Sequence, residues 1–260
     1  MSQRSSLLPL PAKILFPALL ALGLCSCQTV GIEDVIGALG GKSENARAEA
    51  RSDTKADLDG LRERYRANPS NPDVALQFGK ALRESGQRAQ AVAVLEQAVL
   101  VHSANKALLA AYGRALADNG NFQQAFDVLG RAHSPEDPDW RLLSAQGAVL
   151  DQLGRNEEAQ QYYASALKIV PEEPQVLSNL GLSYVLQNNL PRAEETLRRA
   201  QARAPSDVRV RANLAMVVGL QGRQAEAETI VKADLPPDEA QAKVTALRQL
   251  LSKKQQRADK

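Results

Sequence analysis

Apolar and small residues recur along most of the chain at intervals of three and four, with polar residues between them, as in amphipathic helices that pack in pairs. The clearest stretch is 174–205, PQVLSNLGLSYVLQNNLPRAEETLRRAQARAP. Small residues such as Gly181 and Ala193 are expected where the two helices of a pair cross, and larger ones such as Tyr184 beside the crossing. Pro205 ends the second helix, because proline lacks the backbone N–H that would continue it.

The small residues of this stretch recur at a step of 34 residues. Four series run in register: Gly79, Gly113, Gly147, Gly181 and Ala215; Ala91, Ala125, Ala159, Ala193 and Ala227; Ala98, Ala132, Ala166 and Ala200; and the turn residues Gly86, Gly120, Gly154, Asn188 and Gly222. This period and pattern are those of the tetratricopeptide repeat, with leucine at the usual tryptophan and phenylalanine positions. The sequence therefore predicts an all-α fold, a tetratricopeptide (TPR) α–α superhelical solenoid of about twelve helices.

Five predicted repeats account for residues 72–241, as the units 72–105, 106–139, 140–173, 174–207 and 208–241. Residues 54–71 are predicted to form a leading half-repeat, since one amphipathic helix is followed by Pro69 at the final proline position of a repeat. Residues 236–260 are predicted to form a C-terminal capping helix and tail that overlap the end of repeat five. Such ends are needed because the outermost repeats would otherwise expose an apolar face.

Residues 1–26 have the pattern of a lipoprotein signal peptide, with a basic start and the apolar run Ile14 to Leu24. The run is shorter than the roughly 20 apolar residues of a membrane-spanning helix. It leads into Leu24-Cys25-Ser26-Cys27, which resembles a bacterial lipobox with leucine three residues before the lipidated cysteine and a small residue just before it. We predict lipidation at Cys27. Cys25 is the alternative, but it would place Leu24 where a small side chain is required.

Residues 27–53 are predicted to form a lipidated flexible tether, because glycine, serine and mixed charges occur there without periodicity. Cleavage before Cys27 leaves one cysteine, blocked by lipid, and hence no disulfide. It also removes Arg4 and Lys13 from a chain of 32 basic and 30 acidic residues, which leaves 30 of each. By resemblance to lipoprotein sorting, Gln28 after the lipidated cysteine favours export to the periplasmic face of the outer membrane.

The sequence presents no residue pattern for catalysis, a cofactor, a metal ion or a small-molecule substrate. His102 and His133 lie near repeat ends without companions at ligand spacing. The acidic pairs Glu157-Glu158 and Glu194-Glu195 fall early in second helices, where they favour the helix dipole and face solvent. A net charge of +2 without a long basic run argues against nucleic-acid binding. We therefore predict a protein that is not an enzyme.

Recognition of a protein partner by the concave surface, lined mainly by the first helix of each repeat, is the function left. The inward register positions in repeats four and five predict a partner-binding groove formed by Ser178, Asn179, Leu182, Val185, Leu186, Ala212, Asn213, Met216 and Leu220. Asn179 and Asn213 share one register position, where an amide could hydrogen-bond to an extended peptide backbone. The alternative is that the apolar members pack under the C-terminal helix.

The lipobox, the tether, the five repeats, and the segments SNLGLSYVLQNNLPRAEETLRRA, RVRANLAMVVGLQGRQAEAE and DLPPDEA resemble the TadD family of lipoproteins that assemble the tight-adherence (Tad, Flp-type) pilus. The resemblance is best in repeats four and five and elsewhere concerns architecture only. It implies a non-catalytic role in pilus assembly, in which the lipoprotein helps the outer-membrane secretin, or another Tad component, to localise or assemble.

Two other functions fit the same plan. One is a general envelope adaptor that regulates cell-wall enzymes or assists outer-membrane protein insertion, and the other is a type IV pilotin. A neighbouring gene for a secretin, a secretion ATPase and a small pilin would favour the pilus.

Overall fold

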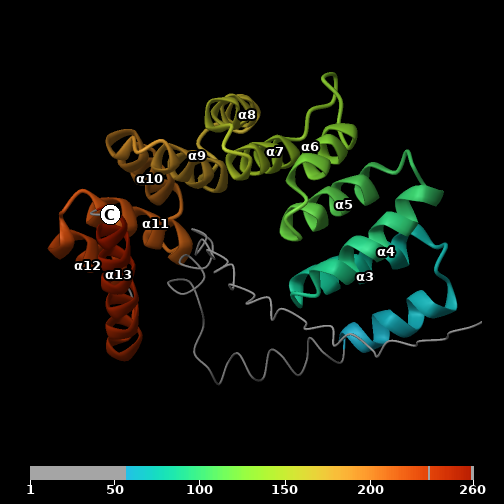
Figure 1. The fold of residues 1–260 in the computed structure, drawn as a ribbon, viewed down its shortest axis with the longest axis horizontal. Coiled ribbons are helices and arrows are strands. Elements are labelled where there is room, and N and C mark those ends of the chain that lie inside the picture. Colours follow the sequence, from blue (N-terminus) through green and yellow to red (C-terminus); the bar gives the residue numbers. More distant parts are fainter. Residues whose placement is uncertain (1–56, 234, 259–260) are drawn as a thin grey trace, which may run out of the picture.

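The computed structural model describes residues 57–233 and 235–258, which contain helices and no strand. A leading helix spans residues 57–67 and is drawn in cyan in Figure 1. Eleven helices follow: α3 (Pro72–Glu84), α4 (Arg88–Val101), α5 (Lys106–Asp118), α6 (Phe122–Arg131), α7 (Trp140–Gln152), α8 (Asn156–Ile169), α9 (Pro174–Leu186), α10 (Leu190–Arg203), α11 (Val208–Leu220), α12 (Gln224–Lys232) and α13 (Pro237–Ala258). The predicted all-α class is confirmed. The predicted signal peptide, Cys27 and the tether lie outside the described residues.

Polar side chains fix where most first helices begin. The side chain of Asn71 accepts hydrogen bonds from the backbone N–H groups of Asp73 and Val74, at 2.9 and 3.2 Å. Asn105 and Asp207 cap α5 and α11 in the same way. Each such cap stabilises a helix by about 1 kcal/mol, because it satisfies backbone donors that the first turn leaves unpaired.

The turn inside each repeat requires a left-handed backbone. Gly86, Gly120, Gly154 and Gly222 have φ angles of 77°, 85°, 74° and 83°. In repeat four Asn188 takes this place with φ 57°, and asparagine tolerates this conformation better than most residues with a side chain. The chain therefore reverses at the same point in every repeat, so each second helix returns antiparallel to the first.

A glycine in each of the first four first helices allows the second helix to approach closely. A Cβ built on Gly147 would lie 2.7 Å from Cε1 of Tyr163 in α8, which no real pair of atoms tolerates. The glycines one repeat earlier and later make the same contact with a leucine sixteen residues further on. These helix crossings therefore have room for the hydrogen atom of glycine but not for the Cβ atom of any other residue.

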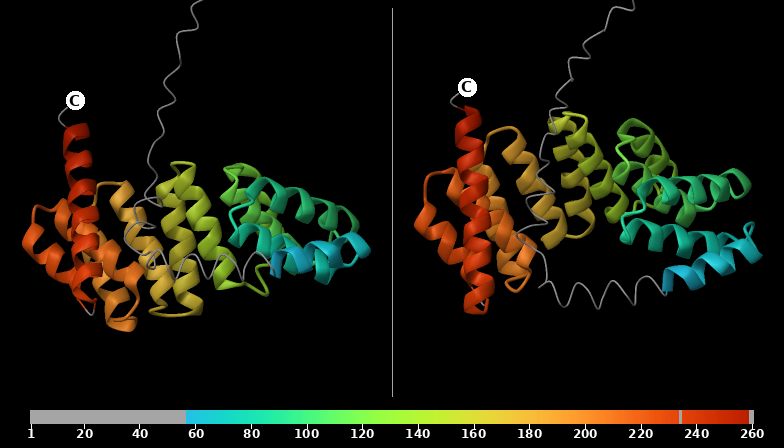
Figure 2. Two further views of the ribbon diagram at one scale, coloured as in Figure 1. Left: turned by 90° about the horizontal axis from the view of Figure 1, so that it is seen from below. Right: turned by 60° about the horizontal axis from the view of Figure 1, so that its bottom comes forward.

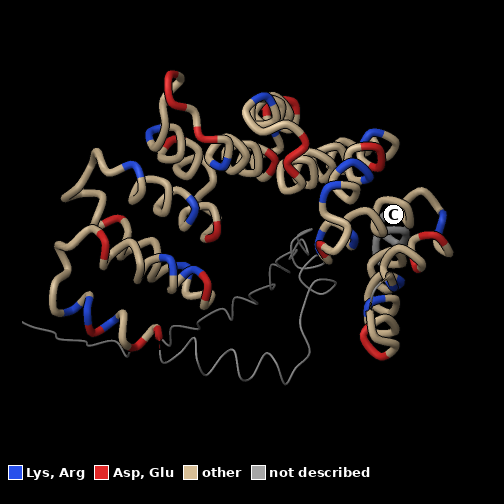
Figure 3. The backbone as a smooth tube through the Cα atoms, turned by 180° about the vertical axis from the view of Figure 1, so that it is seen from behind, with Lys and Arg blue, Asp and Glu red and all other residues tan. Residues whose placement is uncertain are grey.

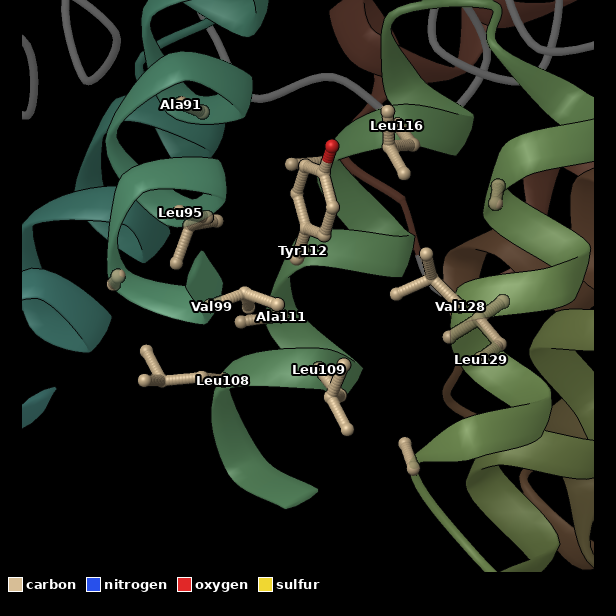
Figure 4. Close-up of a cluster of buried hydrophobic side chains, with 14 of the residues drawn as sticks. Ala91, Leu95, Val99, Leu108, Leu109, Ala111, Tyr112, Leu116, Val128 and Leu129 are labelled. Atoms are coloured by element: carbon tan, nitrogen blue, oxygen red, sulfur yellow. The ribbon is translucent and has the colours of Figure 1, made fainter. Parts of the chain in front are cut away.

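The core lies between these helix pairs and follows the curve of the chain. Figure 4 shows α5 in the middle of one section, with Leu95 and Val99 of α4 on one side and Val128 and Leu129 of α6 on the other. The leading helix covers the start of this core with buried Leu58, and its Tyr65 ring lies 5.3 Å from that of Phe78. Each helix thus buries an apolar face against the neighbours before and after it.

The helix pairs follow one another around an open arch (Figures 1 and 2). Consecutive first helices, α3, α5, α7, α9 and α11, touch each other, whereas consecutive second helices among those described do not. The first helices therefore lie on the inside of the curve and line the concave face.

The regular stacking changes between repeats two and three. Helix α6 has 10 residues, whereas α4, α8 and α10 each have 14. Where the other second helices have one more turn, α6 is followed by a loop. This loop contains Pro135 and Pro138, and the backbone pair Ser134 and Asp137 holds it together. Across this loop α5 and α7 touch less than any other two consecutive first helices. The concave face is therefore most open at this seam.

Helix α13 packs against α11 and α12 and closes the C-terminal end of the arch (Figure 2). Val244, Leu247 and Leu251 of α13 are buried in the same cluster as residues of α9 and α11. A Cβ on Gly219 would lie 2.6 Å from Cδ1 of Leu251, so α13 approaches α11 as closely as the helices of one repeat approach each other.

The structure corrects the assignment of Glu194 to a solvated acidic pair. Its carboxylate pairs with Arg223, the residue just before α12, and accepts a 2.8 Å hydrogen bond from Arg198, which also pairs with Glu226. The Arg223 hydrogen bond is the largest cause that lowers the pKa of Glu194 to about 2. Glu194 therefore helps to join repeat four to repeat five, which its position early in a second helix did not reveal.

We predict that Gly147→Ala destabilises repeat three by about 1–3 kcal/mol, because the added methyl group overpacks against Tyr163. Urea unfolding measures the total loss. Hydrogen exchange should place the faster opening in α7 and α8, since repeats interact only with their neighbours.

The matched control is Gly60→Ala in the leading helix, where an added Cβ meets nothing within 4 Å. There the same substitution should stabilise the helix by up to about 1 kcal/mol, because alanine is the better helix former. Equal effects of the two substitutions would show that α7 and α8 do not cross at Gly147.

Candidate functional site

Most positions of the predicted groove in repeats four and five are buried. Ser178, Val185, Ala212, Asn213 and Met216 are all less than a tenth exposed. Val185, Ala212 and Met216 belong to the cluster that Leu247 and Leu251 of α13 complete. These five residues therefore stabilise the C-terminal end and provide almost no surface to a partner, which corrects their assignment to the groove.

The other four predicted groove residues retain some exposure. Leu186 is 45% exposed, and Asn179, Leu182 and Leu220 are partly buried. Leu182 and Leu220 also pack against the cluster that includes α13. The exposed remainder is therefore small and divided, so repeats four and five do not form a continuous groove.

The two asparagines hydrogen-bond within the protein. Nδ2 of Asn213 donates to Oγ of Ser178 at 2.8 Å, and Nδ2 of Asn179 donates to Oγ of Ser144 at 3.1 Å. Each amide thus reaches a serine in the first helix of the preceding repeat. These hydrogen bonds join α11 to α9 and α9 to α7. They use amide N–H groups that were expected from the sequence to bind the backbone of a partner peptide.

A pocket with a volume of about 550 Å³ lies on the concave face in repeats one to three. It lies at the ends of α3, α5 and α7, beside the sparse contact between α5 and α7. Its lining residues are Arg83, Arg88, Arg114, Ala117, Asp118, Asn119, Gly120, Phe122, Leu129, Ala145, Ala148, Val149 and Gln152.

This pocket uses the register positions of the predicted groove, but in earlier repeats. Ala148 and Gln152 lie one repeat before Leu182 and Leu186, and Arg114 lies one repeat before Ala148. Ala148 leaves space where repeats four and five carry Leu182 and Met216. The pocket therefore lies at the register positions from which the groove was predicted, in repeats one to three and not in repeats four and five.

Three arginines give the pocket its charge. Nε of Arg83 donates to the carboxylate of Asp118 at 2.7 Å. Arg88 and Arg114 form no ion pair with any residue that the structure describes. Burial, followed by repulsion from Arg83, lowers the pKa of the half-buried Arg114. Basic positions lie on α3 and α5 beside the hollow of the arch in Figure 3.

A partly buried carboxylate fixes the end of α7, which forms one wall of the pocket. Asp151, next to Gln152 at the end of α7, accepts hydrogen bonds from Asn156 and Ser183 at 2.8 Å and from Tyr163 at 2.9 Å. Burial raises the pKa of Asp151, while these three donors oppose that change. The node joins α7 to α8 and α9, so the end of α7 is fixed relative to the repeats on its C-terminal side.

No metal site is predicted from the sequence, and the two histidines considered for one lie in the part of the chain that the structure describes. Within the described ranges no three His, Cys, Asp or Glu side chains group as a metal site would require. Nε2 of His102 bonds the backbone oxygen of Ser70 at 2.8 Å, and Nε2 of His133 bonds Gln146 at 2.9 Å. Both histidines therefore make contacts between or beside repeats. No described helix is both long and apolar enough to cross a membrane.

One sequence signal could have found the pocket. Arg114 and Arg83 stand at inward register positions of repeats two and one, where a solenoid with only structural needs would carry small or apolar residues. The predicted groove was placed where the repeat pattern is strongest. A tightly matched pattern marks good packing, and packing leaves little open surface.

Comparison with known families agrees with this geometry. Models described as tetratricopeptide repeat match residues 76–139, 152–217 and 208–232, which together cover more than half of the chain. No curated protein matches the sequence.

Three solved structures share the fold at low identity. A tetratricopeptide repeat protein from Parabacteroides merdae has 17% identity and a TM-score of 0.61, with 86% of each chain covered. TTC0263, a thermophilic TPR protein in Thermus thermophilus, has 20% identity and a TM-score of 0.57, covering 66% of this chain and 94% of its own. MamA has 19% identity and a TM-score of 0.51, covering 64% and 96%. The predicted solenoid is confirmed, and the chain belongs to the tetratricopeptide repeat family, whose members are generally non-catalytic scaffolds that bind protein partners.

Proposed function

We propose that this protein is a non-catalytic scaffold that holds a partner protein in the concave pocket of repeats one to three. The observation that carries the proposal is the pocket itself, formed by three successive first helices at the most open seam of the arch. Elsewhere the inner positions are closed by α13 or by hydrogen bonds between repeats. A partner segment that follows the first helices would therefore meet this pocket.

The proposed setting is the bacterial envelope, at the periplasmic face of the outer membrane, with a lipid anchor on Cys27. The proposed role is assembly of the Tad pilus, with the secretin or another Tad component as the partner. The support is the lipobox spacing Leu24-Cys25-Ser26-Cys27 and the family resemblance of repeats four and five and of the segment DLPPDEA. The lipid anchor would hold the scaffold at the membrane in which a secretin assembles.

Cys27→Ser should abolish lipidation and leave an uncleaved precursor, because the thioether that precedes cleavage would not form. Labelling with radioactive palmitate and the size of the product on a gel measure both effects. Cys25→Ser is the matched control and should be processed normally. Mature, detergent-phase protein from Cys27→Ser would rule out the anchor at that residue.

A photo-crosslinking amino acid at Gln152, which is exposed and lines the pocket, should capture the partner in membranes of the native host. The same substitution at Gln161, an exposed glutamine of α8 away from the pocket, is the control. We expect mass spectrometry to identify a secretin or another Tad component only with the Gln152 crosslinker. Capture of a cell-wall enzyme or an outer-membrane insertion factor would favour the general envelope adaptor, and equal capture from both positions would place the binding surface elsewhere.

A further inference from the structure

The charge in the pocket is unbalanced. Its lining holds three arginines and one aspartate, and Asp118 already pairs with Arg83 at 2.7 Å. Arg88 and Arg114 are left without an ion pair among the described residues. The lining therefore presents two guanidinium groups, each with a fork of N–H donors that fits a carboxylate.

Of the two arginines, Arg114 is the more buried. It is half-buried in the concave face, so part of its hydration has been removed without replacement by an acceptor. Burial is the largest cause that lowers the pKa of Arg114; repulsion from Arg83 and Arg141 adds to it, and Asp139 and Asp118 act in the opposite direction. A bound anion would supply the missing acceptors and reduce the repulsion.

Much of the rest of the lining is apolar and includes Phe122, Val149, Ala145 and Ala148, beside the polar Asn119 and Gln152. The two alanines lie on α7, whereas Arg83, Arg88 and Arg114 lie on α3, α4 and α5. A small inorganic anion would leave this wall uncovered. A chain that carries both carboxylates and apolar side chains would satisfy both sides of the pocket.

We propose that the pocket binds an extended acidic segment of the partner protein. Carboxylates of the segment pair with Arg88 and Arg114, and an apolar side chain between them packs against Phe122 and Ala148, which are both partly exposed. This inference rests on the proposed function, since it gives the chemistry of the partner that the same site holds. Recognition of acidic motifs by arginine clusters is a general mode of peptide binding.

The test uses the full chain and ten-residue fluorescent peptides in which leucine alternates with glutamate, glutamine or lysine. Fluorescence anisotropy measures binding at low and at high salt. We expect the glutamate peptide to bind at least about tenfold more tightly than the glutamine peptide, which corresponds to about 1.4 kcal/mol. The difference should shrink as salt is raised, because the ion pairs are partly screened.

Arg114→Gln should remove most of this preference, and Arg88→Gln should weaken it. The control is Arg131→Gln, which makes the same charge change at an exposed position of α6 outside the pocket and should leave binding unchanged. Arg114→Lys serves as a second variant in case Arg114→Gln melts early, and it should retain the charge preference but bind less tightly than the parent.

Several outcomes would overturn the proposal. Equal affinity for the glutamate and glutamine peptides would mean that charge does not select the segment. The separate proposal that the protein is a scaffold for a partner would not be affected. Absence of binding, or unchanged binding by both Arg114 variants, would also refute it. Tighter binding of a peptide with the sequence of residues 28–56 would assign the pocket to this chain's own acidic and apolar segment, and a salt-sensitive dimer lost in Arg114→Gln would assign it to a second copy. Failure of the Gln152 crosslinker would instead count against the scaffold proposal itself.

Discussion

The close contact between the two helices of each repeat is the constraint on which the rest of the structure depends. At Gly79, Gly113, Gly147 and Gly181 the second helix comes so near that a methyl group would collide with it. The crossing point fixes how each pair packs, and the turn residue seven positions later, glycine or Asn188, fixes where the chain reverses. Because the same contact recurs at every step of 34 residues, the first helices line up along the inner face of one arch.

Register alone does not decide whether the inner face is open. One inward position carries Arg114 and Ala148 in repeats two and three, and Leu182 and Met216 in repeats four and five. The larger residues are covered by α13 and become core, whereas Ala148 lines the pocket of about 550 Å³. The loop that replaces the end of α6 adds to this opening, since α5 and α7 meet only sparsely beside it. One repeat pattern thus produces an open pocket at one end and a closed cap at the other.

The sequence predicted what depends on local spacing. The helix pairs, the crossing glycines and the left-handed turn at Asn188 follow from the 34-residue period, because each repeat makes the same contacts with its neighbours. The site depended on contacts that spacing does not reveal. Asn213 bonds Ser178 across repeats, Glu194 pairs with Arg223, and Leu251 packs on Gly219 from a helix outside the repeat pattern. These pairings bury several of the residues that were predicted to line a groove in repeats four and five.

The central claim, that side-chain contact at the helix crossing sets the fold, is tested most directly by a double-mutant cycle at Gly181 and Leu197. A Cβ on Gly181 would lie 2.6 Å from Cγ of Leu197 and near both of its methyl groups. Urea unfolding of Gly181→Ala, Leu197→Ala and the double mutant measures their coupling. The account predicts that Gly181→Ala is strongly destabilising in the parent and nearly neutral once Leu197 is alanine, a coupling of about 1 kcal/mol or more. Additive losses would mean that these two residues do not meet, and would contradict the account.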